Sequence, residues 1–227
     1  MLNNIFLSIG WIVVMVIALC ELILFFWLLK RYLYSKKLIC VDMVVLTLGL
    51  FFYTAVLSVG RFVETGPLLR MLSKVSVIVR ALVLPLILVI CAYALDLSDS
   101  LKRTFWIITI IFMIVGVTAA VLTKLEPAKV TGVVFYRPVR ETAKWLNMIN
   151  TYLPLGILAI GAICALVMIF KVRSGWFFLG IGGNLGLRVA GMIYGFENQM
   201  ILIGLFGEVL MILCFWLYSR KLKKSYL

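Results

Sequence analysis

Four ionisable side chains lie inside long apolar stretches of this sequence, and they are its best candidates for chemistry: Glu21, Arg80, Arg188 and Glu208. A charged group at the depth of a bilayer is costly, so it is expected to face a partner or a polar cavity. Arg188 and Glu208 lie at similar depth on two consecutive apolar stretches, which predicts an ion pair. Removing one partner would leave a buried charge alone, at a cost of roughly 3–5 kcal/mol.

Arg80 allows two interpretations. It lies in the outer part of its apolar stretch, where its long side chain can reach the interface or pair with Glu64. Alternatively, Arg80 and Arg188 face one outward cavity and hold an anion. Asn184 precedes Arg188 by one helical turn and shares its face. The predicted ligand-binding set is Arg80, Asn184, Arg188 and Glu208.

Glu21 lies in the inner half of the first apolar stretch, with no obvious basic partner at that depth. Burial without a partner favours its uncharged form, or places it on a route for protons or cations. We therefore treat Glu21 as a candidate proton or ion site. Asp42, near the inner end of the second stretch, is expected to face Lys36, Lys37 or water.

The segment from Gly180 to Gly191 is rich in glycine but does not match a nucleotide-binding loop. A GxGxxG motif starting at Gly180 would need glycine where Leu185 stands. Gly182, Gly186 and Ala190 recur every four residues, which predicts a stripe of small residues that lets two helices approach closely. The same glycines could instead make the helix bendable.

The sequence contains no histidine, which excludes imidazole ligands to haem or zinc and the His-dependent catalytic pairs. None of the five cysteines forms a CxxC motif, and all lie in or near apolar stretches, as buried apolar residues do. No paired-carboxylate spacing typical of acid–base catalysis is present. We therefore expect no catalytic residues, no metal site and no cofactor.

The composition of the chain indicates the environment in which its secondary-structure elements position these residues. Hydrophobic residues make up 65% of the 227 residues and charged residues 14%, and the mean hydropathy is +1.18. A soluble domain of this size cannot hide that much apolar surface, so the chain is expected in a lipid bilayer. The formal charge of +13 does not indicate nucleic-acid binding, because the basic residues cluster at the ends of apolar stretches, as membrane topology requires.

The predicted fold class is all-α: a single polytopic domain, residues 1–227, forming a bundle of seven transmembrane helices. About 20 apolar residues are needed to cross a bilayer, and period-2 alternation is missing, which excludes a β-barrel. The first stretch is longer than the core of a signal peptide and is expected to be retained. The seven predicted spans are Ile5–Leu29, Leu38–Gly60, Val75–Leu95, Phe105–Thr123, Met148–Phe170, Trp176–Phe196 and Met200–Tyr218.

The connections predict orientation. With the N-terminus outside, the inner connections carry more Lys and Arg than the outer ones, so N-out, C-in is favoured. The long outer segment Lys124–Asn147 is interpreted as an interfacial loop with an aromatic belt, or alternatively as a cap over an outer pocket. Pro85 and Pro154 are expected to kink or loosen their helices.

The seven-span pattern, with Leu46–Ala55 and Arg80–Leu95, resembles the seven-helix sensory region at the N-terminus of bacterial sensor histidine kinases. The third helix of that family looks similar, with a proline in mid-span, here Pro85, and a tyrosine near its inner end, here Tyr93. The sequence departs from the family because it has neither a phosphoacceptor histidine nor an ATP-binding domain. The resemblance therefore implies a separate output partner.

These observations predict a non-enzymatic, receptor-like or regulatory membrane subunit that senses a small, anionic or lipidic ligand from the outer side. A protein partner would bind the basic inner loops and the tail Arg220–Leu227. Two alternatives stay open: a transporter or channel subunit, and a structural anchor in a larger membrane complex. The expected location is a prokaryotic plasma membrane, with multiple passes.

Overall fold

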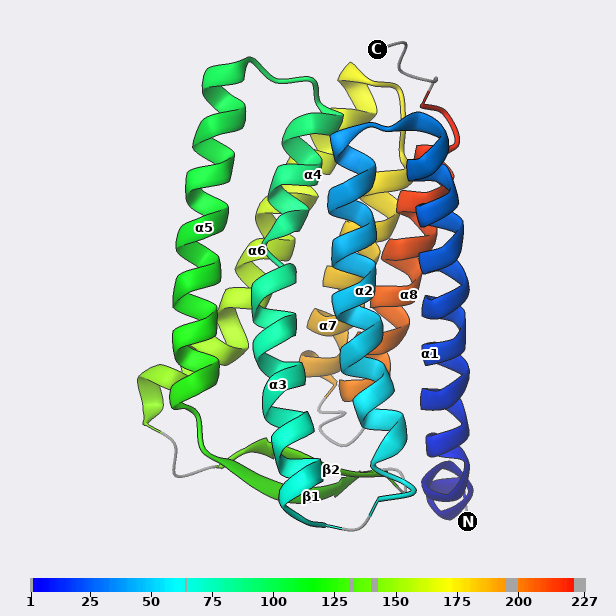
Figure 1. Cartoon of the computed structure of the whole chain (residues 1–227), viewed down its shortest axis with the longest axis vertical. Coiled ribbons are helices and arrows are strands. Elements are labelled where there is room, and N and C mark those ends of the chain that lie inside the picture. The colour runs from blue at the N-terminus through cyan, green and yellow to red at the C-terminus, as the bar shows by residue number, and fades with distance from the viewer. Residues whose placement is uncertain (1, 64, 131–132, 140–142, 195–199, 223–227) are drawn as a thin grey trace.

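The computed structural model describes residues 2–63, 65–130, 133–139, 143–194 and 200–222. Its elements form one bundle of helices, as predicted, with a two-stranded hairpin across one end (Figure 1). The helices in chain order are α1 (Leu2–Ser35), α2 (Leu38–Val59), α3 (Pro67–Val83), α4 (Leu86–Ala94), α5 (Asp99–Leu122), α6 (Lys144–Lys171), the π-helical turn η1 (Phe178–Gly182), α7 (Gly183–Ile193) and α8 (Met200–Ser219).

Six helices within the described residues are long and apolar enough to cross a membrane, with α3 and α4 together forming one of them. The predicted span Trp176–Phe196 corresponds to a shorter apolar helix, Phe178–Ile193, and residues 195–196 lie outside the described residues. Large apolar side chains cover the outside of the bundle, for example Ile23 on α1, Ile114 on α5 and Ile163 on α6. Such a surface suits contact with lipid rather than water.

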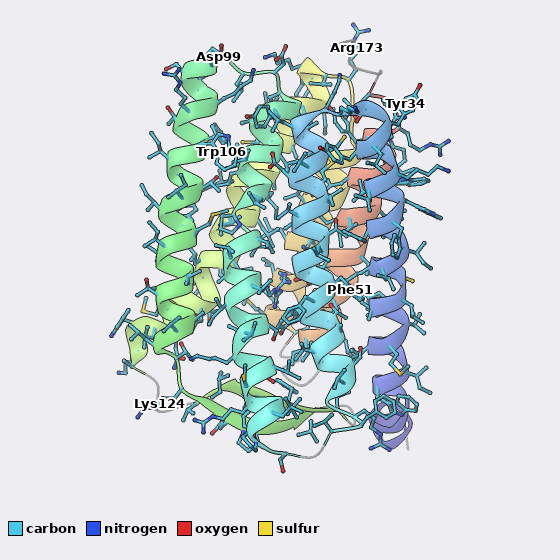
Figure 2. All side chains as sticks on the ribbon, in the orientation of Figure 1. Tyr34, Phe51, Asp99, Trp106, Lys124 and Arg173 are labelled. Carbon is cyan, nitrogen blue, oxygen red and sulfur yellow. The ribbon has the colours of Figure 1, made fainter. Side chains whose placement is uncertain are left out.

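Polar side chains gather at the two ends of the bundle. Figure 2 places Asp99 and Arg173 at one end and Lys124 at the other, where the hairpin lies. The chain enters α1 at the hairpin end, and α8 finishes at the opposite end (Figure 1). There Arg31 donates from Nε to the Ser219 carbonyl at 2.7 Å, which ties α1 to the end of α8.

Pro85 interrupts its helix, as predicted. Proline has no backbone N–H to donate and its ring clashes with the preceding turn, so α3 ends at Val83 and α4 begins at Leu86. The Thr109 hydroxyl of α5 donates to the Pro85 carbonyl at 3.4 Å. By contrast, α6 continues through Pro154 as one helix.

The hairpin was not predicted as such. Strand β1 (Leu125–Val130) pairs antiparallel with β2 (Val133–Pro138), within the segment predicted as a loop or cap. Val133 and Phe135 are buried against Leu57 of α2 and its neighbours. The Val134 amide donates to the Gly60 carbonyl at 3.3 Å, which fastens the hairpin to the end of α2.

Candidate charged site

Three charged side chains from three helices meet inside the bundle. Arg188 of α7 and Glu208 of α8 form the predicted ion pair, with Arg188 Nη2 at 2.5 Å from Glu208 Oε1. Arg80 of α3 binds the same carboxylate oxygen. Arg80 therefore turns inward instead of reaching the interface, and its other predicted partner, Glu64, lies outside the described residues. Two guanidinium groups share one carboxylate that is completely buried.

Neighbouring groups hold the two guanidiniums in place. Arg188 Nε donates to Asn184 Oδ1 at 3.0 Å, which confirms that the two side chains share a helix face. Asn184 is completely buried, and its Nδ2 lies 3.9 Å from the Met211 sulfur on α8. Arg80 lies over the ring of Tyr53 from α2, with 4.4 Å between Cζ and the ring centroid, a cation–π arrangement.

Glycines bring α7 and α8 together, but they are not the predicted ones. A Cβ built on Gly207 would lie 3.0 Å from the Asn184 Cα, and one on Gly204 would lie 3.3 Å from the Arg188 guanidinium carbon. The absence of side chains on these α8 residues leaves the room that Asn184 and Arg188 occupy. Close packing here therefore depends on the glycines of α8.

The two glycines of the predicted stripe Gly182, Gly186 and Ala190 do not make this close contact. A Cβ on Gly186 would meet nothing within 4 Å, and the three atoms nearest to one on Gly182 would all belong to Phe178, at 3.5–3.7 Å. The reason is helical geometry. Each of these residues lies two positions from the Asn184–Arg188 row, which is about 200° around an α-helix. Because the polar row must face Glu208, the small-residue stripe faces away.

Glu21 lies near this cluster on α1. Its side chain is completely buried, and neither carboxyl oxygen has a hydrogen-bond partner among the described residues. Glu208 and Arg80 are close enough to act on it electrostatically, but no described ion pair or hydrogen bond joins Glu21 to a basic group. The neighbouring Thr54 hydroxyl donates instead to the Leu50 carbonyl at 3.2 Å. The second oxygen of Glu208 also lacks a described partner.

A cavity of about 280 Å³ lies beside the cluster, between α3, α5, α6 and α7. Arg80 and Arg188 both line it, as one of the two interpretations of Arg80 predicted, and 22% and 17% of their side chains remain exposed. Tyr53 and Asn150 add neutral polar groups, and most of the remaining lining is apolar. The cavity lies in the half of the bundle nearer the hairpin, because it is lined by the end of α5 and the first half of α6.

The hairpin covers the end of the bundle, but none of its described residues lines this cavity. Tyr53 and Asn150 were not among the predicted site residues. Each is a polar residue in an apolar stretch, and this feature of the sequence could have identified both as candidates. Asn150 donates from Nδ2 to the Thr123 hydroxyl at 2.8 Å, which links α6 to the end of α5 beside the cavity.

Among the described residues, the remaining ion pairs lie at the ends of the bundle: Lys102 of α5 is 3.5 Å from Asp96 and from Asp99, and Arg137 pairs with Glu126 on the hairpin. Within the described parts of the chain, no group of three or more Cys, Asp or Glu side chains could hold a metal ion, and the five cysteines are free. Asp42, predicted to face Lys36, Lys37 or water, is 7% exposed; among the described residues it forms no ion pair, and its Oδ2 has no hydrogen-bond partner. No protein-family model matches the chain, and no curated protein matches it either.

Proposed function

We propose that this chain is a receptor-like or regulatory membrane subunit that binds an anion beside Arg80 and Arg188. One observation carries the proposal: two guanidinium groups share a single carboxylate oxygen and also line a cavity. Arginine presents up to five N–H donors in a planar fork, which suits a carboxylate or phosphate ligand. An anion entering the cavity would find N–H donors already oriented by Asn184, Tyr53 and Glu208.

Binding would be coupled to the opposite end of the bundle through α8. Glu208 lies near the middle of α8, and the end of that helix is tied to Arg31 of α1. An incoming anion competes with Glu208 for the two arginines, so it favours any arrangement in which α8 shifts relative to α3 and α7. A ligand shifts such an equilibrium only by its difference in affinity for the two arrangements.

The proposed topology is seven crossings with the N-terminus outside and the C-terminus inside. The hairpin would then lie outside, with the cavity in the outer half, and the basic inner connections would face the cytoplasm of a prokaryotic cell. In that arrangement the chain is similar to the sensory region of sensor kinases. Its output would pass to a separate protein through the inner loops and the tail beginning at Arg220.

A transporter is the second candidate, and Glu21 is the observation that favours it. A completely buried carboxyl group without a described hydrogen-bond partner, near Glu208, suits the transfer of coupling protons. Flux of phosphate or hexanoate into liposomes containing only this chain, abolished by Glu21→Gln, would favour transport. A chain that binds these anions without moving them would favour sensing.

The proposal is tested by thermal unfolding of the protein in nanodiscs, with phosphate, hexanoate or palmitate added. We expect at least one anion to raise the unfolding temperature of the wild type and of Arg137→Ala, but not of Arg188→Ala. Arg137 is a matched control because it lies on the hairpin, where it pairs with Glu126, away from the cavity. Arg188→Lys, which retains the charge, serves as a second variant if the alanine variant folds poorly.

Sensing also requires a response at a distance. Hydrogen exchange at the ends of α1 and α8 around Arg31 and Ser219 should change when the anion binds. Equal stabilisation of the wild type and Arg188→Ala would remove the proposed site. Binding with no change in exchange at that end would remove the receptor-like role and leave a binding or anchoring role.

A further inference from the structure

An apolar groove adjoins the charged cavity on the outside of the bundle. The groove lies between α5 and α6 and is lined by side chains such as Phe112, Val115 and Tyr152. Cavity and groove share three lining residues, Ile149, Leu153 and Ile157. Tyr152 is 61% exposed, so the groove opens on the surface that would face the hydrocarbon of a bilayer.

Gly156 leaves this groove open. It lies on the exposed side of α6, and a Cβ built on it would meet nothing within 4 Å. Pro154, two residues earlier, lines the cavity. A glycine without a packing partner at this position therefore leaves space in the groove, on the helix that also lines the cavity beside Arg80 and Arg188.

We propose that cavity and groove form one binding site for a single-chain anionic amphiphile of the fatty-carboxylate type. Its head would bind Arg80 and Arg188, and its chain would lie between α5 and α6. This inference rests on the proposed function and names the class of ligand. A two-oxygen carboxylate matches the planar fork of a guanidinium, whereas neutral lipid heads offer no charge to pair with it.

The size and charge of the cavity favour a small, single-chain ligand. At about 280 Å³, the cavity is at the lower end of ligand pockets, which are typically about 300–1,000 Å³. That volume suits a carboxylate and the first part of a chain better than a bulky phospholipid head. Glu21 does not line the cavity, so its carboxyl group does not block the entrance to the arginines.

The test uses palmitate carrying a photoreactive diazirine in its chain, with the full-length protein in nanodiscs and the labelled peptides mapped by mass spectrometry. We expect labelling of α5 and α6 near Val115, Tyr152 and Ile160, lost in Arg188→Ala. Gly156→Leu should also lose it, because the added side chain fills the groove. Gly186→Leu is the matched control, since Gly186 also has open space but lies on α7.

Competition identifies the head group. Unlabelled palmitate should displace the probe at a mole fraction at least about tenfold lower than hexadecanol does, because a charged hydrogen bond contributes enough free energy for that ratio. Labelling that persists in Arg188→Ala and Gly156→Leu, or equal competition by hexadecanol, would mean ordinary boundary lipid and would overturn the inference.

The outcomes separate this inference from the proposed function. If phosphate or hexanoate stabilises the wild type but not Arg188→Ala, while palmitate does not label the groove, the anion site stands and the amphiphile site fails. If no anion stabilises the protein and palmitate does not label it, both fail.

Discussion

At the scale of single residues, the defining feature is one carboxylate serving two arginines. Glu208 is completely buried, while each arginine keeps part of its side chain at the cavity. Pairing offsets the cost of removing these charges from water only where the geometry is close. The cluster is therefore both a structural contact between α3, α7 and α8 and a site where an added anion would find donors.

Glu208→Gln should destabilise the protein more than Arg188→Ala does. The glutamine leaves two guanidiniums without the carboxylate that both of them bind, whereas loss of Arg188 leaves the Arg80–Glu208 pair. Orphaning one buried charge typically costs roughly 3–5 kcal/mol. The measurement is thermal unfolding of both variants in the same detergent.

Glu126→Gln is the matched control for Glu208→Gln. Glu126 pairs with Arg137 across the hairpin at 3.2 Å, with side chains 34% and 45% exposed. Exposed ion pairs contribute about 0–1 kcal/mol to stability, so the unfolding temperature of this variant should be close to that of the wild type. Similar decreases in unfolding temperature for Glu126→Gln and Glu208→Gln would show that the buried cluster contributes no more to stability than an exposed ion pair.

Depth counting along the helices was enough to predict the Arg188–Glu208 pair, because the two residues lie on consecutive antiparallel helices. It did not predict that Arg80 joins them. That contact depends on how α2 packs against both α3 and α8, which spacing along one helix does not encode. Tyr53 was missed for a similar reason, since tyrosine in an apolar stretch usually indicates packing or an interface.

At the scale of elements, the contact between α7 and α8 decides whether the site forms. The face of α7 that turns to α8 is set by Asn184 and Arg188, and Gly204 and Gly207 leave the space that these side chains need. Small residues that allow close approach are a common basis of helix association in lipid. Packing and charge pairing are therefore coupled in this pair of helices.

Gly207→Ala should lower the unfolding temperature and weaken anion binding, because its Cβ would lie 3.0 Å from the Asn184 backbone and push the helices apart. Gly186→Ala adds the same methyl group where nothing lies within 4 Å. Alanine favours a helix over glycine by about 1 kcal/mol, so this control should be neutral or stabilising. Thermal unfolding of both variants measures the difference, and equal effects would contradict the assigned packing face.

The hairpin shows what apolar stretches alone cannot predict. Pro127 and Pro138 lie in the segment Lys124–Asn147 that was predicted as a loop or cap, yet both occupy strand positions, opposite Tyr136 and Leu125. The alternation of buried Val133 and Phe135 with more exposed neighbours was the signal available in the sequence. This alternation covers too few residues to predict a strand from sequence alone. A two-stranded hairpin is only marginally stable by itself, so these strands depend on packing against α2 and α3.

At the scale of the whole molecule, the apolar outer surface and polar ends follow directly from composition, and the helical bundle could be predicted for that reason. The number of crossings depends on the Phe178–Ile193 helix. At about 1.5 Å per residue it extends roughly 24 Å, shorter than a hydrocarbon core of about 30 Å. A bilayer can thin locally to match a short helix at a modest cost, so this helix is expected to cross.

Cysteine labelling of the full chain in intact bacterial cells tests that expectation. Arg173 and Tyr194 flank the short helix, and both are exposed. With a membrane-impermeant maleimide, Tyr194→Cys should react in intact cells, as should Lys144→Cys at the hairpin end. Arg173→Cys should react only after the cells are permeabilised, like Arg220→Cys beyond α8.

Reaction of Arg173→Cys and Tyr194→Cys from the same side would mean that the short helix does not cross. Reversal of all four results would mean that the cavity opens from the inner half, and a ligand would then have to come from the cytoplasmic leaflet.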